Sequence, residues 1–168
     1  MIRDVLVLGL FPAAMAFAAA SDLVSMTISN RLSIALVLGF FLMAAAIGMP
    51  LNQVGSHVLA CVVVLVVAIG FFARSWIGGG DAKLAAATAL WLGFPHLMNY
   101  LLVAALMGGA LTLILLELRK IPLPAALAGR SWIARLHAVD SGIPYGIALA
   151  AAGLTVYPET IFMRALAN

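Results

Sequence analysis

Residues 54–73 read VGSHVLACVVVLVVAIGFFA and contain no Asp, Glu, Lys or Arg. An α-helix needs roughly 20 apolar residues to cross a hydrocarbon core about 30 Å thick, and this stretch has that length. Hydrocarbon offers the backbone no hydrogen-bonding partner, so only helices and closed barrels can cross it. Because the run is continuously apolar and does not alternate, a barrel strand is excluded. The stretch therefore predicts a transmembrane α-helix.

The rest of the chain has the same character. Of its 168 residues, 65% are hydrophobic and 9% are charged, and the mean hydropathy is +1.19. Soluble domains average about 45–50% apolar and about 25% charged residues. We therefore expect an all-α, polytopic integral membrane protein, with about six transmembrane helices in one compact bundle and a single domain over residues 1–168. The predicted spans are residues 5–21, 32–50, 54–73, 82 to about 94, 97–117, and about 143–157.

The first 21 residues, MIRDVLVLGLFPAAMAFAAAS, admit a second interpretation. A cleaved signal peptide has a basic start, an apolar middle and small residues at its cleavage site, and Arg3 with residues 18–21 fits that pattern. However, Asp4 offsets the charge of Arg3, and further apolar spans follow directly. We therefore expect this segment to be retained as the first span.

Basic residues gather in alternate loops. If the six spans alternate in direction, loops 22–31, 74–83 and 118–142 share one side of the membrane and hold seven of the nine Lys and Arg residues. The other side holds two, Arg3 and Arg164. Cytoplasmic loops carry an excess of Lys and Arg, so the three loops are predicted to be cytoplasmic and both termini to lie outside. The seven residues are Arg31, Arg74, Lys83, Arg119, Lys120, Arg130 and Arg135.

The long basic loop 118–142 contains a helical pattern of its own. Apolar residues recur there at helical spacing with arginines among them, which predicts a basic helix at the membrane interface. Such a helix either rests on anionic lipid headgroups or docks a substrate. The apolar residues of the pattern are Trp132, Ile133, Leu136 and Val139.

Several kinds of site are disfavoured. The net charge is +3 and no five like charges are adjacent, so a nucleic-acid partner is not expected. A single cysteine, Cys61, permits neither an internal disulfide nor a cysteine-based zinc site. The histidines His57, His96 and His137 lack metal-ligand spacing. We therefore expect no metal and no cofactor.

Two of the six acidic residues share a membrane depth. Asp22 and Asp81 lie at the cytoplasmic ends of the first and fourth predicted spans. Carboxylates are costly at the edge of the hydrocarbon and usually mark a functional site there. Each has an ordinary alternative, because Asp81 follows three glycines and fits a helix N-cap, and Asp22 fits a solvated loop acid. The shared depth favours a paired site.

The residues around both aspartates resemble a known family. Residues 78–84, GGGDAKL, resemble the GxGD motif, commonly GxGDxKL, of the type IV prepilin peptidases. Asp22 followed by Ile28 and Asn30 resembles that family's first aspartate with its downstream IPN turn, although Ser29 stands where proline is usual. Residues 143–148, IPYGIA, look like the family's last-span signature. The three motifs occur in the family's order.

The resemblance implies an activity, a substrate and a location. The chain is similar to the short CpaA-type peptidases of Flp/Tad pilus systems, which lack the cysteine-rich insert of the longer bifunctional relatives, so N-methyltransferase activity is not expected. The family implies a peptidase of the bacterial inner membrane that removes the leader of a prepilin at the cytoplasmic face, after a glycine. Both termini would then be periplasmic. Prepilin and membrane lipids are the expected partners, and the oligomeric state is left open.

The resemblance also implies roles for particular residues. Asp22 and Asp81 would be the catalytic pair, and two close carboxyls sharing a proton can supply both the base and the acid of peptide hydrolysis. Gly78, Gly79 and Gly80 are expected to bring the backbone close to a substrate and to take positive φ angles, although a flexible loop is the ordinary alternative. Lys83 is expected either to stabilise Asp81 or to meet lipid phosphate. Asn30 is expected to support the site.

Other functions remain open for the same two carboxylates. A small transporter or channel would use Asp22 and Asp81 to bind cations or relay protons. A non-catalytic subunit of a pilus or secretion machine would need neither of them. A presenilin-like intramembrane protease also uses GxGD, but Ser21 stands where a tyrosine would precede its first aspartate.

Overall fold

The computed structural model describes residues 2–166, with side chains for all of these except residues 2, 3 and 125. Within that part of the chain every regular element is a helix, which confirms the predicted all-α class. Residues 1, 167 and 168 of the predicted domain, and the side chain of Arg3, lie outside the described part. The elements are α1 (Ile2–Ser25), α2 (Asn30–Ala46), α3 (Leu51–Ala73), α4 (Gly79–Leu118), α5 (Ala125–Ala128), α6 (Ser131–His137), α7 (Tyr145–Val156), the 3-10 turn η1 (Tyr157–Glu159) and α8 (Ile161–Arg164).

The helices have the length and composition of membrane spans. Four segments are long and apolar enough to cross a bilayer, namely Asp4–Ser25, Leu51–Ala73, Gly79–Leu118 and Tyr145–Arg164, and α2 is a shorter apolar helix. A polytopic membrane bundle is therefore confirmed. The predicted fourth and fifth spans both lie within α4, which is interrupted where the prediction placed their boundary.

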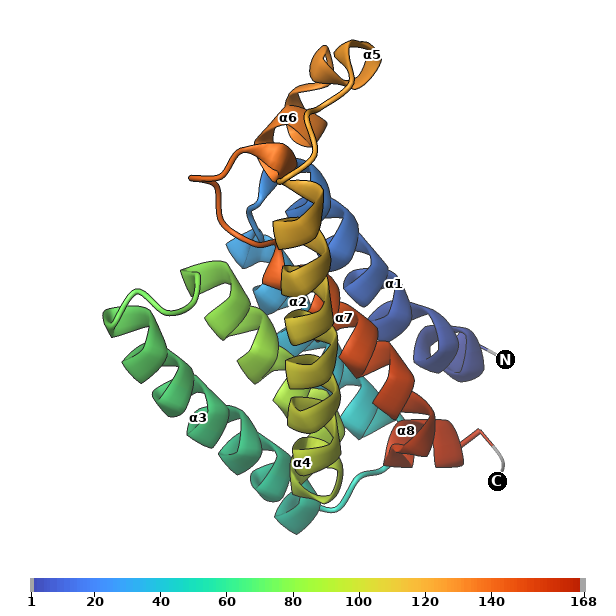
Figure 1. Ribbon diagram of the computed structural model, residues 1–168. Helices are drawn as coiled ribbons and strands as arrows, with labels where there is room; N and C mark the ends of the chain where they lie inside the picture. Colours follow the sequence, from blue (N-terminus) through green and yellow to red (C-terminus); the bar gives the residue numbers. More distant parts are fainter. Residues whose placement is uncertain (1, 167–168) are drawn as a thin grey trace.

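The interruption of α4 is at Gly93. This residue has φ 67° and ψ 175°, a conformation that favours glycine, and Pro95 follows without a backbone N–H to donate. Just before the interruption, Nδ1 of His57 donates to the carbonyl of Leu90 at 2.7 Å. Figure 1 shows the chain reversing here, from a yellow-green half that descends to an ochre half that rises. The two halves of α4 are therefore antiparallel neighbours, as two separate spans would be.

The bundle has two distinct ends (Figure 1). The termini, α8, the turn between α2 and α3 and the reversal at Gly93 lie at one end, which we call the terminal end. The last turn of α1, the first turn of α4, and helices α5 and α6 lie toward the other, which we call the site end. The three basic loops therefore share one end of the bundle, as the alternating spans predicted.

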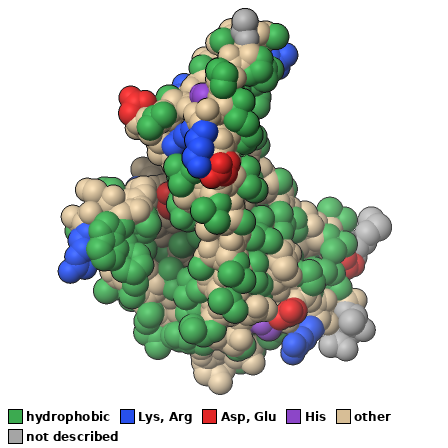
Figure 2. Space-filling model, in the orientation of Figure 1, with side chains coloured by type: hydrophobic (Ala, Val, Ile, Leu, Met, Phe, Trp, Pro, Cys, Tyr) green, Lys and Arg blue, Asp and Glu red, His purple; other side chains and the backbone are tan. Residues whose placement is uncertain are grey.

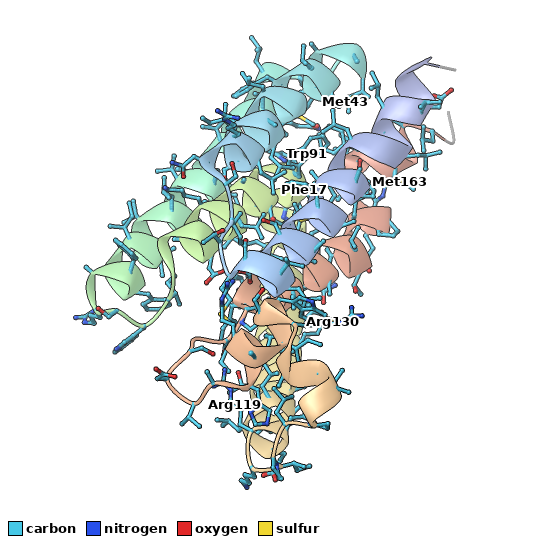
Figure 3. The ribbon with its side chains drawn as sticks, turned by 90° about the horizontal axis from the view of Figure 1, so that it is seen from above. Phe17, Met43, Trp91, Arg119, Arg130 and Met163 are labelled. Carbon is cyan, nitrogen blue, oxygen red and sulfur yellow. The ribbon has the colours of Figure 1, made fainter. Side chains whose placement is uncertain are left out.

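An aromatic core holds the half of the bundle near the terminal end. Trp91 is fully buried, and its ring centroid lies 5.3 Å from that of Phe11 and 4.9 Å from that of Phe162. Its Nε1 donates to the carbonyl of Leu36 at 2.9 Å. Figure 3 shows Trp91 among the helices, well separated from Arg119 and Arg130. Aromatic pairs of this kind favour one packed arrangement, so this half is a fixed base for the site end.

Residues 118–142 form an arm that projects beyond the bundle (Figure 2). Its α6 contains three of the four apolar residues of the predicted interfacial helix, but it ends at His137 because Ala138 has ψ 130°. Val139, the fourth, lies outside the helix with 82% of its surface exposed, so that part of the prediction was wrong. The Arg119 guanidinium braces the arm by donating to Leu136 O, Ser141 Oγ and Gly142 O, each at 2.9 Å.

Candidate active site

Asp22 lies in the last turns of α1. The helix continues to Ser25, past the predicted end of the first span, so Asp22 belongs to the helix and not to the loop. Its side chain is only 4% exposed, and Oδ2 accepts a hydrogen bond of 2.7 Å from the backbone N–H of Gly146. That N–H is in the first turn of α7, where backbone donors have no partner within the helix and the helix dipole is positive. The interpretation of Asp22 as a solvated loop acid was therefore wrong.

Asp81 lies in the first turn of α4. Gly78 is the N-cap, with φ −72° and ψ 148°. The Asp81 carboxylate turns back toward it and accepts a hydrogen bond from the backbone N–H of Gly78. This is the geometry in which an acidic side chain in the first turn satisfies the N-cap donor. A Cβ added at Gly78 would lie 3.0 Å from Asp81 Oδ2. Glycine at this position therefore leaves room for the carboxylate.

Packing contacts bring the two carboxyl groups near each other, because Ile28 lies against both Gly146, which donates to Asp22, and Gly80, which precedes Asp81. They come from the end of α1 and the start of α4, and they are close enough to interact electrostatically. Asp81 is half-buried and Asp22 is buried. Two close carboxyls can share a proton, so that one is ionised while the other is protonated.

The three glycines before Asp81 lie close to side chains of the protein itself, and their expected approach to a substrate stays a prediction. None of them has a positive φ, since Gly48 and Gly93 are the glycines of the described residues with that conformation. The expectation of positive φ angles was therefore wrong. A Cβ at Gly79 would lie 3.3 Å from the Phe72 ring, and a Cβ at Gly80 would lie 3.1 Å from Ile28 Cβ.

Lys83 and Asn30 are brought together. Lys83 Nζ donates to Asn30 Oδ1 at 2.7 Å, which joins the first turns of α4 and α2. The structure thus gives Lys83 a side-chain partner other than Asp81. Both residues are exposed and belong to the framework around the carboxyl pair.

One contributor to the site was not predicted. Gly146 donates to Asp22, whereas the sequence marks it only as part of the motif at residues 143–148 and of a helix start after Pro144, the N-cap of α7. A helix start indicates free N–H groups without naming the acceptor. The acceptor depends on α1 packing against α7, which no local pattern encodes.

The histidines each have a separate partner. His57 bonds Leu90 O, and His137 Nε2 lies 2.6 Å from Ile121 O. His96 Nδ1 lies 3.6 Å from a carboxylate oxygen of Glu159. Among the described residues, no group of three or more His, Cys, Asp or Glu side chains is arranged to hold a metal ion.

Comparison with known proteins identifies relatives for part of the chain. It is 48% identical over 58 residues to the "Prepilin leader peptidase/N-methyltransferase" of Pectobacterium carotovorum subsp. carotovorum, a match of 34% of this chain and 21% of the relative. It is 38% identical over 61 residues to the protein of the same name from Dickeya chrysanthemi, covering 36% and 22%. The chain thus spans about a fifth of the length of these curated relatives. No solved structure was found to match.

A family model covers much more of the chain. Residues 9–113 match the model described as the type IV leader peptidase family. This region includes both aspartates, the three glycines, Lys83 and Asn30. The match extends over more than half of the sequence, so the chain belongs to the type IV leader peptidase family.

Proposed function

We propose that this protein is an aspartic endopeptidase that removes the leader of a type IV or Flp prepilin, with Asp22 and Asp81 as its catalytic pair. The observation that carries the proposal is the meeting of two carboxyls from distant parts of the sequence at one end of the bundle, inside the region that matches the family. Membership of a leader peptidase family and the names of the relatives support the prepilin substrate.

The chemistry needs one ionised and one protonated carboxyl. The ionised carboxyl takes a proton from water while the hydroxide attacks the scissile carbonyl carbon, and the protonated carboxyl donates to the carbonyl oxygen. The tetrahedral intermediate collapses when its nitrogen takes the proton from the first carboxyl and the C–N bond breaks. One of its hydroxyl groups then returns a proton to the second carboxyl, which re-forms the C=O bond and restores both carboxyls to their starting states. The hydrogen bond from Gly146 occupies Oδ2 of Asp22 and leaves Oδ1 available to the water.

The arrangement of the helices suits a membrane-embedded substrate. Both carboxyls lie at the site end, the end at which the three basic loops gather. By the excess of Lys and Arg in cytoplasmic loops, this end faces the cytoplasm of a bacterial inner membrane and both termini face the periplasm. A substrate whose apolar helix lies in the bilayer would present the bond between its leader and that helix at the cytoplasmic edge of the membrane.

Co-expression with a candidate prepilin tests the proposal. We expect the wild type to remove the leader, and Asp22→Ala and Asp81→Ala each to leave it uncleaved at equal membrane levels. Glu117→Ala is the matched control, because Glu117 is an exposed acid near the end of α4 that pairs with Lys120. Leader removal that persists in both aspartate variants would refute the catalytic pair.

Substitutions of the same two aspartates separate the peptidase from a transporter and from an assembly subunit. An ion-coupled transporter would lose ion flux in proteoliposomes on Asp22→Asn or Asp81→Asn, without any peptide processing by the wild type. An assembly subunit would tolerate both substitutions in a pilus-assembly assay. A peptidase loses processing and has no ion flux to lose.

A further inference from the structure

The side chain of Ile28 lies between two glycines that belong to different helices. A Cβ added at Gly80 in α4 would lie 3.1 Å from Ile28 Cβ and 3.4 Å from its backbone N. A Cβ added at Gly146 in α7 would lie 2.7 Å from Ile28 Cδ1. Ile28 is only 9% exposed. Its side chain therefore occupies the gap between the first turns of the two helices and touches both backbones.

Each of these glycines is linked directly to one carboxyl group. Gly80 precedes Asp81 in the chain, and the N–H of Gly146 donates to Asp22 Oδ2 at 2.7 Å. A change in the gap between the two first turns would therefore move one carboxyl relative to the other. Because catalytic groups must be held within about 0.5 Å of the productive geometry, such a movement matters for hydrolysis.

The turn between α1 and α2 fixes the position of Ile28. Met26 has a left-handed φ of 51°, which is uncommon for a residue other than glycine and needs support from its surroundings. Hydroxyl groups supply that support, because Ser21 Oγ donates to Thr27 O at 2.9 Å and Ser25 Oγ donates to Ser21 O at 2.7 Å. The turn thus leaves α1 in a fixed direction and directs Ile28 inward.

We propose that Ile28 is a positioning residue that sets the separation of Asp22 and Asp81 by packing between Gly80 and Gly146. The glycines are then the two contact faces, and the isoleucine is the spacer between them. The effect of Ile28 on catalysis rests on the proposed peptidase function. Its effect on the separation of the two aspartates does not.

The spacing is tested first without any activity assay. With Cys61 replaced by alanine, Asp22→Cys and Asp81→Cys are combined, and the yield of thiol cross-linking by a short bismaleimide is compared with and without Ile28→Ala. We expect the yield to fall at least about twofold when the spacer is removed. Leu36→Ala, which truncates a fully buried side chain of α2, is the control and should leave the yield unchanged. Equal yields with and without Ile28→Ala, including none in either, would overturn the proposal.

The second test measures the kinetics of leader removal from an uncleaved prepilin that the wild type processes. Ile28→Ala should lower kcat about 10- to 100-fold, keep KM within about twofold and shift the pH–rate profile, because the reacting groups are misplaced while the substrate is still bound. Ile28→Val, which removes only the methyl facing Gly146, should have a smaller effect in the same direction. Leu36→Ala should lower thermal stability alone.

The two tests separate failure of the role from failure of the function. A wild type that processes no prepilin would refute the proposed function, and the cross-linking comparison would still decide whether Ile28 sets the spacing. A normal kcat and pH profile for Ile28→Ala in an active enzyme would overturn the positioning role even if cross-linking changed.

Discussion

Replacing Gly146 with alanine should damage the site through a single methyl group. The added Cβ would lie 2.8 Å from Asp22 Oδ2 and 2.7 Å from Ile28 Cδ1, whereas nine in ten real Cβ contacts are longer than 3.4 Å. The carboxylate must then move by about 0.6 Å, away from the N–H that now donates to it at 2.7 Å. The methyl therefore strains the hydrogen bond that holds Asp22.

The size of the effect follows from that hydrogen bond. A hydrogen bond to a charged group contributes about 1.5–3 kcal/mol, and each 1.36 kcal/mol of barrier is about a tenfold change in rate. We therefore expect kcat for leader removal to fall about 10- to 100-fold in Gly146→Ala. Unaltered substrate binding would leave KM within about twofold.

The assay is leader removal from a purified prepilin in detergent or proteoliposomes, over a range of substrate concentrations. Gly109→Ala is the control, because it also adds a methyl to a membrane helix and meets nothing within 4 Å. Its kcat should equal that of the wild type. A wild-type kcat for Gly146→Ala at equal folded levels would refute the reasoning that this backbone N–H holds Asp22 in its working position.

Three further predictions concern other parts of the molecule. Asp81→Asn should lower kcat for leader removal about 10²- to 10⁴-fold, because the variant lacks one of the two carboxyls. The wild type should have a bell-shaped pH–rate profile, since one carboxyl must be ionised and its partner protonated. Lys83→Met should lose the bond to Asn30 and lower stability by about 0.5–1.5 kcal/mol in denaturant unfolding, with kcat within about threefold. His57→Ala leaves the Leu90 carbonyl at the reversal without its donor, so unfolding stability should fall by about 1–3 kcal/mol while the prepilin KM is unchanged.

Much of the fold follows from the sequence because the solvent dictates it. A charge-free apolar run such as residues 54–73 has few choices in hydrocarbon, and it forms α3. The reversal of α4 was also predictable, since Gly93 and Pro95 together disfavour a continuous helix. The expected N-cap position of Asp81 was wrong, because Gly78 is the N-cap and Asp81 lies in the first turn of α4. The side chain still satisfies a free donor of that turn, which is the part that its residue type predicts.

The parts that could not be predicted depend on contacts between distant segments. The first helix continues through Asp22 because the carboxylate is satisfied by α7, more than a hundred residues later in the chain. Lys83 reaches Asn30 because α2 packs beside α4. Periodicity and capping rules describe single helices, whereas the partner of a buried polar group is decided by tertiary packing.

The short first half of α4 has a consequence for how this segment is placed in a membrane. From Gly79 to the reversal at Gly93 the helix has about 14 residues, which at 1.5 Å per residue is about 21 Å. A bilayer interior about 30 Å deep exceeds that length by several ångströms. Residues 86–93 of this half are all buried among other helices, so protein and not lipid surrounds most of the segment. The neighbouring longer helices therefore span the remaining depth, and the bilayer need not thin to match the short one.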